Sequence, residues 1–395
     1  MTSPAHSPVR EPGFSPLGYA RSRLALGVAG VGTTVLLAVG LLARDVPATR
    51  FATTPGQSAA QTLTDVGIAF AMTALLLLPF DLLGGVWVVR SRAMVSRWIS
   101  GWLRGVVVQW LVWMLVATAL MLTARSAAAP ATLAVFVGLQ LLLAACRGWF
   151  VRIIGSITVH APSPALTVAA KRAGLDVRGL QVVDSPDEGF VGGWSGLVPG
   201  TLVVPKRWEQ LPSDTLVAQL VRRQVVAESG AHHRGVLGAI AWNTTGFLLV
   251  QYLSGTTPAT AAGLITLAAG MTLWAFLGVL LLPTPSRAAV YAADAAVAAR
   301  VGAAAVRTGI EQLDQWQDDE PRRPPLIERI FHPVPARTNR LDRLASSGDT
   351  GLKPWHLHHL ARQTLWLGWG TFSPIARAVH CNVGRPALWA MLPGD

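Results

Sequence analysis

Side chains that could bind a metal ion gather in one short segment of the chain. Glu228 precedes His232 by one helical turn, His233 follows directly, and a carboxylate with two imidazoles is a common zinc ligand set. Gly230 lies between them, however, and glycine is the residue type that most often ends a helix. Two interpretations stay open: a zinc site, or a polar collar where a membrane helix meets the lipid headgroups.

A second candidate for chemistry is an acidic residue inside an apolar segment. Asp81 follows Pro79 by two residues within a long hydrophobic run, and a carboxylate at membrane depth is costly enough to indicate a function. Arg90 follows about nine residues later, so Asp81 could instead lie near the membrane interface or cap the break introduced by Pro79. The sequence leaves both interpretations open.

The elements that must position these residues are mostly membrane-spanning helices. The chain has 395 residues, of which 14% are charged, and its mean hydropathy is +0.43. Soluble domains carry roughly a quarter charged residues, and a membrane span needs about 20 apolar residues. Six segments qualify, the fourth being the shortest: Leu24–Leu42, Val66–Val89, Gly105–Leu122, Ala131–Cys146, Val236–Leu253 and Ala259–Leu282.

Basic residues are concentrated in alternate loops between these segments. They precede the first span and follow the second and fourth spans, whereas the intervening loops carry few. The positive-inside rule therefore predicts a multi-pass protein of the plasma or inner membrane with both termini in the cytoplasm. The formal net charge is +12, and in a lipid-spanning chain it favours the bilayer, with other membrane proteins as partners, over nucleic acid.

The spans divide the chain into six predicted parts. The fold class expected is a mainly α membrane protein of about six transmembrane helices with a cytoplasmic α+β body. The parts are a disordered N-terminus (1–23), four transmembrane helices (24–146), the cytoplasmic body (147–235), a transmembrane hairpin (236–282), a segment with a second helix and a His-Pro pair (283–350) and a Trp-rich interfacial tail (351–395).

Tryptophans among basic or apolar residues predict contact with the membrane interface in two places. The tail contains Trp355, Trp366, Trp369 and Trp389, and we expect it to lie against the bilayer or to pack on the body. The loop Arg90–Arg104 mixes arginines with tryptophans and leucine, which predicts a short amphipathic helix in the headgroup layer.

The cytoplasmic body combines short strands with two longer helices. Glycine and turn residues separate the expected strands from a helix that Ser213 or Asp214 begins and Gly230 ends. A second, Ala-rich helix follows the hairpin, and His332 with Pro333 is expected to fix a turn. The predicted ranges are Val177–Val183, Gly189–Trp194 and Thr201–Val204 for strands, and Pro164–Ala173, Ser213 or Asp214 to about Ser229, Ser286–Val306 and Ala336–Leu344 for helices.

This order of elements resembles the HtpX-type and CAAX-prenyl-protease-type integral membrane zinc metallopeptidases. The resemblance covers about Pro164–Leu344 and rests on the strand pair, the helix Thr215–Ala227, Asp294 in the second helix and the element from His332 to Arg340. It implies a metallopeptidase-like body. In such a body a His-Glu-x-x-His helix and a Glu from the second helix hold zinc, and the motif Glu is the general base.

The positions that the resemblance assigns to this zinc site hold residues that cannot bind zinc. Arg222 and Val226 stand at the two His positions, Arg223 at the base, and Val290 at the Glu ligand, while Asp294 is retained. Arginine stays protonated and valine has no donor atom. We therefore expect a degenerate member with no cofactor, in which Arg222 and Arg223 form ion pairs with Asp294 where zinc would lie.

Three functions follow from these residues. The preferred one is a non-catalytic scaffold or regulator that binds membrane protein partners. The first alternative is an active membrane metalloendopeptidase that holds zinc through Glu228, His232 and His233. The second alternative is a small transporter or channel with Asp81 as its polar residue.

Overall fold

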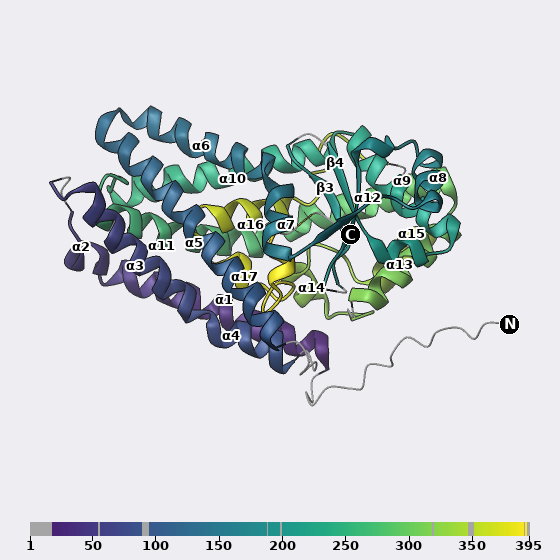
Figure 1. Ribbon diagram of the computed structural model, residues 1–395, viewed down its shortest axis with the longest axis horizontal. Coiled ribbons are helices and arrows are strands. Elements are labelled where there is room, and N and C mark those ends of the chain that lie inside the picture. The colour runs from purple at the N-terminus through teal and green to yellow at the C-terminus, as the bar shows by residue number, and fades with distance from the viewer. Residues whose placement is uncertain are drawn as a thin grey trace.

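A bundle of long helices and a smaller α+β body lie side by side in the molecule (Figure 1). The structure is a computed structural model, and it describes residues 18–53, 56–88, 95–187, 189–197, 200–317, 320–346, 351–390 and 392. Most of the predicted disordered N-terminus, residues 1–17, lies outside the described residues. Helix α1 (Tyr19–Ala43) begins five residues ahead of the expected start at Leu24.

Five described helices are long and apolar enough to cross a membrane, or six if one bent pair counts as a span. This confirms the predicted mainly α membrane protein. The bent pair is α6 (Ala129–Ala145) with α7 (Arg147–Gly155), which meet at 60° where the fourth span was expected. Four of the other spans are single helices: α1, α5 (Val95–Ser126), α10 (Ala231–Ser254) and α11 (Ala261–Leu281). The remaining span, Ala59–Trp87, consists of α3 (Ala59–Leu76), α4 (Leu78–Leu82) and the π-helix η1 (Leu83–Trp87).

Helix α5 also takes in most of the loop that was expected to form a separate amphipathic helix. Residues 90–94 lie outside the described residues, but α5 runs unbroken from Val95 through Trp102. Trp102 is buried, and its indole N–H donates to Oδ2 of Asp81 at 2.9 Å. The predicted interfacial position is therefore wrong for Trp102, because a buried carboxylate inside the bundle accepts its N–H.

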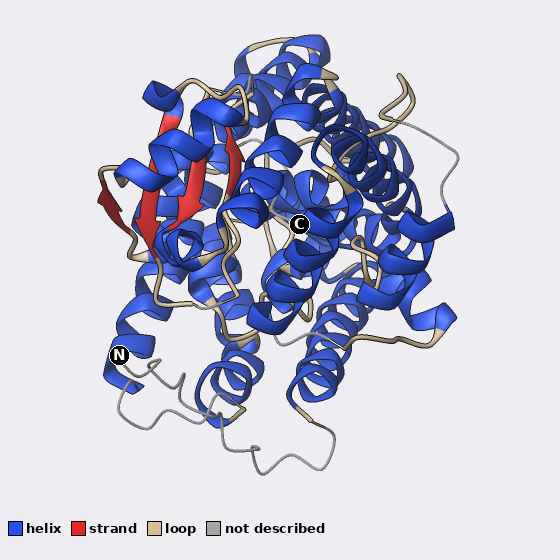
Figure 2. Cartoon of the chain, turned by 90° about the vertical axis from the view of Figure 1, so that its right-hand side faces the viewer, coloured by secondary structure: helices blue, strands red, loops and turns tan. Residues whose placement is uncertain are grey.

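A four-stranded sheet (Figure 2) contributes side chains to two hydrophobic cores, one in the bundle and one in the body. The strands are β1 (Thr158–His160), β2 (Leu180–Asp184), β3 (Gly193–Ser195) and β4 (Thr201–Pro205), in the order β1-β2-β4-β3; only β2 and β4 pair in parallel. Side chains alternate between the faces of a strand. Val183 and Val203 accordingly join the bundle core, whereas Val182 and Val204 join the body core.

The helices of the body cover the other face of this sheet. Helix α9 packs against α8, α12 and α13, and α15 packs against α12 and α13. The predicted second helix is broken at Gly302, whose φ of 88° ends α12 before α13 begins. The remaining bounds are α8 (Pro164–Arg172), α9 (Ser213–Glu228), α12 (Pro283–Val301), α13 (Ala303–Gln317), α14 (Pro325–Phe331) and α15 (Arg337–Ser346), with a short α2 (Val46–Arg50) between the first two spans.

The C-terminal segment runs into the bundle. Helix α16 (Leu360–Gly370) packs against α10, α11, α5 and α6, and the short α17 (Ile375–Ala378) packs against α1 (Figure 1, yellow). Trp366, Trp369 and Trp389 are fully buried, whereas Trp355 is 67% exposed. Of the two expected arrangements, packing on the rest of the protein holds for three of the four tryptophans, whose rings bury a large apolar area.

Candidate functional site

Three helices of the body bring a buried carboxylate together with two guanidinium groups. Asp294 of α12 accepts a hydrogen bond from Nη1 of Arg222, which comes from α9. Arg340 of α15 donates from Nε to Oδ2 and from Nη2 to Oδ1, both at 2.8 Å. All three side chains are less than a tenth exposed. We call these residues the Asp294 cluster, and in it the expected ion pair between Arg222 and Asp294 is present.

Arg223 has a different set of contacts from its neighbour. Its Nη1 donates to the backbone and side-chain oxygens of Gln219 at 3.1 and 2.7 Å, and its guanidinium lies 4.5 Å from the ring centre of Trp208. Adjacent residues on an α-helix point about 100° apart. Because α9 directs Arg222 toward α12, Arg223 is turned toward its own helix and Trp208.

Aliphatic side chains occupy the other two positions that the resemblance assigns to ligands. Val226 and Val290 are both buried, and Val226 packs with Ala231 and Ala293. Zinc needs about four N, O or S donors, including three from protein. The cluster offers one carboxylate whose oxygens already accept N–H groups from two cations. The residues present therefore do not fit a zinc ion.

Glu228, the carboxylate of the alternative zinc ligand set, makes a hydrogen bond and an ion pair at the protein surface. Glu228, the last residue of α9, accepts a hydrogen bond from Gln224 at 2.9 Å and forms an ion pair with Arg300 at 2.9 Å. These hydrogen bonds lower the pKa of Glu228, so the group is ionised at neutral pH. Its contacts join α9 to α12 on an exposed surface.

The two histidines of this set lie on the next helix. Gly230, with φ of 70°, separates α9 from α10, which begins at Ala231. His232 is buried, and its Nε2 lies 3.1 Å from the carbonyl oxygen of Gly196, while its ring centre is 6.0 Å from that of His233. Within the described part of the chain, no three His, Cys, Asp or Glu side chains are grouped as a metal site. The structure thus does not assemble the alternative ligand set.

Asp81 belongs to a buried ion pair that the sequence did not indicate. Its Oδ2 accepts from Nη2 of Arg377 at 2.5 Å, and its Oδ1 accepts from the backbone N–H of Gly384 at 3.1 Å. Both charged side chains are 1% exposed, and the guanidinium lies 4.7 Å from the ring centre of Trp389. The pair joins α4 to the C-terminal segment. An arginine within an apolar, Trp-rich stretch was the signal that could have identified the partner.

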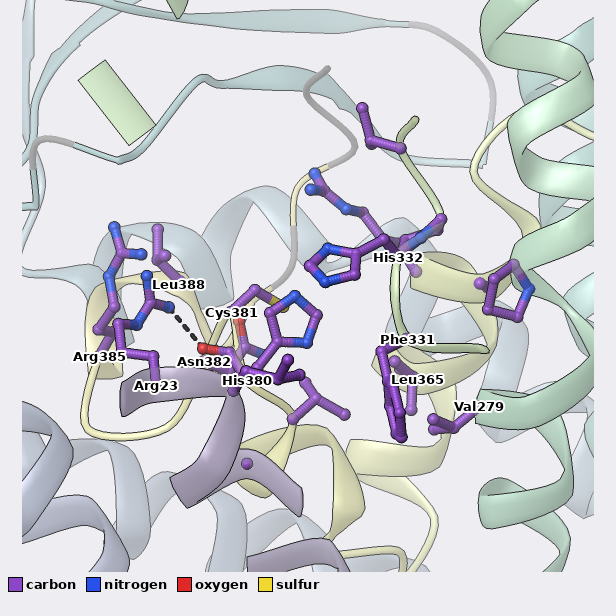
Figure 3. Close-up of a pocket in the computed structure, with 18 of the residues that line it drawn as sticks. Arg23, Val279, Phe331, His332, Leu365, His380, Cys381, Asn382, Arg385 and Leu388 are labelled. Atoms are coloured by element: carbon purple, nitrogen blue, oxygen red, sulfur yellow. Dashed lines mark hydrogen bonds between the residues drawn. The ribbon is translucent and has the colours of Figure 1, made fainter. Parts of the chain in front are cut away.

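His332 lies beside a cavity that sequence reasoning missed. The residue follows α14 and is buried, and its ring centre is 4.4 Å from that of His380 (Figure 3). Burial, with Arg323 and Arg287 nearby, lowers its pKa to about 2, so the imidazole is neutral. The cavity, of about 390 Å³, lies between α1, α11 and the C-terminal segment. Arg340, the other predicted member of the His-Pro element, lies in the Asp294 cluster instead.

Comparison with known proteins identifies the fold. The structure is similar to the crystal structure of S. mikatae Ste24p, with a TM-score of 0.60 and 15% sequence identity, and the match covers 79% of this chain and 79% of that chain. No protein-family model and no curated protein matches the sequence. At this identity the comparison establishes the architecture: the chain has the membrane-helix bundle and the α+β body of the Ste24p fold.

Proposed function

We propose that this chain is a metallopeptidase-like membrane protein that has lost zinc catalysis and acts as a scaffold or regulator for membrane protein partners. Ste24p is a CAAX prenyl protease, an integral membrane zinc metallopeptidase. The shared fold supports the prenyl-protease side of the resemblance. Loss of the motif, binding of partners and a cytoplasmic location of the body and both termini are part of the proposal.

The Asp294 cluster is the observation that carries this proposal. It lies on α9 and α12, the two helices to which the resemblance assigns the metal ligands, and two fixed positive charges contact its carboxylate. A dication placed there would be repelled by both guanidiniums, strongly so in a buried site of low dielectric constant. The cluster ties α9, α12 and α15 together, as a bridging metal ion would.

The two alternative functions receive less support from the described contacts. A peptidase built on Glu228 and the two histidines would need side chains that the fold assigns to separate helices. A transporter would need Asp81 to exchange ions or protons, whereas its oxygens accept hydrogen bonds from Arg377, Trp102 and Gly384. Breaking such a buried pair costs about 3–5 kcal/mol, which favours a structural role for this carboxylate.

The first experiment purifies the full chain in mild detergent. Its zinc content is then measured by elemental mass spectrometry and divided by the protein concentration. We expect a value near zero because the cluster offers no vacant donors. Reconstituted protein should also leave unstructured peptide substrates uncut. About one zinc per chain would overturn the proposal, as would cleavage that a chelator abolishes.

A restored motif tests whether α9 and α12 retain the metallopeptidase frame. The fourfold variant Arg222→His, Arg223→Glu, Val226→His and Val290→Glu restores the three zinc ligands and the general base of the motif. The two imidazoles then lie one turn apart on one helix face. In the matched control, Gln224→His replaces Val226→His, because residues two apart do not share a face. We expect zinc to bind the restored variant at about one per chain and the control far less.

The outcome of this comparison is read on folded protein. Both variants must elute as single symmetric peaks in size-exclusion chromatography, and zinc binding must raise the melting temperature of the restored variant. Equal zinc uptake by the restored variant and the control would contradict the assignment of the metallopeptidase ligand positions to α9 and α12. The absence of zinc from a folded restored variant would contradict it as well.

A further inference from the structure

A tight turn ahead of α16 carries an exposed tryptophan at its tip. The turn runs from Lys353 to His356, and the backbone N–H of His356 closes it by donating to the carbonyl oxygen of Lys353 at 3.0 Å. Pro354 occupies the second position, where its fixed φ favours a β-turn. Trp355 is 67% exposed, although Nζ of Lys353 lies 5.4 Å from its ring centre and the ring of His356 lies 5.9 Å away. The turn therefore presents a large aromatic side chain to the surroundings.

Arg234 of α10 fastens this turn to the start of a membrane-spanning helix. Its Nη2 donates to the carbonyl oxygen of Lys353 at 3.2 Å, and its Nε donates to that of His356 at 3.4 Å. A third hydrogen bond, from Nη1 to the carbonyl oxygen of Ser229 at 2.8 Å, joins the same guanidinium to the end of α9. Because a guanidinium is planar and donates in fixed directions, these bonds hold the turn in one position against α10.

The chain that follows the turn runs along the first turns of α10. The backbone N–H of His358 donates to the carbonyl oxygen of Ala231 at 3.3 Å. A Cβ added at Gly235 would lie 2.1 Å from the carbonyl oxygen of His358, so the two backbones approach closely where glycine has no side chain. A Cβ at Gly238 would lie 3.7 Å from a methyl carbon of Leu357. The turn and the segment after it are thus held at the level where α10 begins.

The start of α10 lies at the boundary of the membrane. Leu237 is 60% exposed on a helix that is apolar enough to span a bilayer, so this side chain faces hydrocarbon. Arg234 precedes it by three residues, which is about 4.5 Å along the helix axis. The headgroup layer on each side of the hydrocarbon is about 5–8 Å thick. The turn that Arg234 holds therefore lies at the depth of the headgroups.

We propose that the Trp355 turn is a membrane anchor, whose indole inserts into the headgroup layer beside α10 and holds the body against the bilayer. Tryptophan suits this layer because its ring is apolar and its one N–H needs a polar partner. Lipid is favoured over a protein partner because lipid surrounds the exposed side chains of α10 at this depth. His356 of the same turn lines a cleft with Asp294 and Arg340, so the anchor also sets the position of that cleft relative to the bilayer. The proposal does not depend on the loss of zinc catalysis.

Photo-crosslinking of the full chain in phosphatidylcholine nanodiscs tests the depth of the turn. Benzoylphenylalanine, a photoreactive aromatic amino acid, replaces Trp355, and the readout is the fraction of the chain that gains the mass of a phosphatidylcholine. The same replacement of Leu237 is the positive control within the hydrocarbon. Replacement of Val168 is the matched negative control, because this side chain is 59% exposed on α8, at the end of the body away from the bundle (Figure 1).

We expect the Trp355 position to crosslink lipid at least about tenfold more than the Val168 position, because tryptophan at the interface contacts lipid directly. Absence of a lipid adduct at Trp355 together with an adduct at Leu237 would overturn the proposal. Equal labelling at Trp355 and Val168 would overturn it too. In native membranes, a protein adduct at Trp355 in place of a lipid adduct would identify a site for a protein partner and contradict the anchor.

Hydrogen exchange tests whether the indole itself holds the turn to the bilayer. Trp355→Gln removes the aromatic ring, whereas Trp355→Tyr keeps a ring that is suited to the interface. We expect Trp355→Gln to speed exchange of the backbone amides of residues 352–359 in nanodiscs by about threefold or more. Trp355→Tyr and the control Val168→Gln should keep the original rate. Equal exchange in Trp355→Gln and the original chain would contradict the anchor.

Discussion

Replacing Asp294 with asparagine removes the negative charge that holds two buried arginines. Asn has nearly the same shape, so the packing of α9, α12 and α15 is retained while the amide cannot balance Arg222 and Arg340. Breaking a buried ion pair by removing one partner costs about 3–5 kcal/mol because it leaves uncompensated charge. Two guanidiniums lose their partner here, so we expect a loss at the upper end of that range.

Such a loss is large against the total free energy of unfolding, which for a folded domain is about 5–15 kcal/mol. The assay is reversible denaturation in mixed micelles, followed by tryptophan fluorescence, or the shift of the melting temperature in detergent. Asp342→Asn, at an exposed carboxylate on α15, is the matched control and should change the free energy of unfolding by less than about 0.5 kcal/mol.

A second variant separates lost charge balance from lost packing. Arg222→Met with Arg340→Met and Asp294→Leu removes every charge of the cluster, and well-packed apolar replacements of buried ion pairs are often neutral. We expect this triple variant to be more stable than Asp294→Asn alone. The reasoning is refuted if Asp294→Asn costs less than about 1 kcal/mol, or if the triple variant is the less stable of the two.

Two further perturbations follow from the other buried groups. Asp81→Asn should leave Arg377 buried without its carboxylate, cost about 3–5 kcal/mol and expose the C-terminal segment to trypsin, whereas the exposed Asp45→Asn should not. Unchanged proteolysis would show that the Asp81–Arg377 ion pair does not hold the C-terminal segment in place. His332 has a folded-state pKa of about 2, below its ordinary 6.5, so its contribution to stability is full above pH 6.5 and falls as the pH decreases, by up to about 1.4 kcal/mol per unit. His332→Gln should flatten the melting temperature between pH 6 and 4, and an unchanged slope would contradict the assignment.

The sequence by itself was enough to locate most of the membrane helices and the order of the body. Length and hydropathy are local properties, and lipid requires every spanning segment to satisfy its own backbone hydrogen bonds. Five spans could therefore be assigned from runs of apolar residues. The strands near Val182 and Val203 and the helix with Arg222 were likewise marked by β-branched runs, turn residues and a glycine stop.

Tertiary structure alone decided how these elements meet. Asp81 pairs with Arg377, 296 residues away, and Asp294 takes a second arginine from α15, contacts that no local periodicity encodes. Tryptophans of the tail suit an interface or an interior equally well, because each ring combines an apolar body with one N–H donor. Acceptors inside the bundle, such as the carbonyl oxygen of Leu143 for Trp366, place the tail inside. Burial and partner geometry, which arise only when distant segments pack, determined the candidate site.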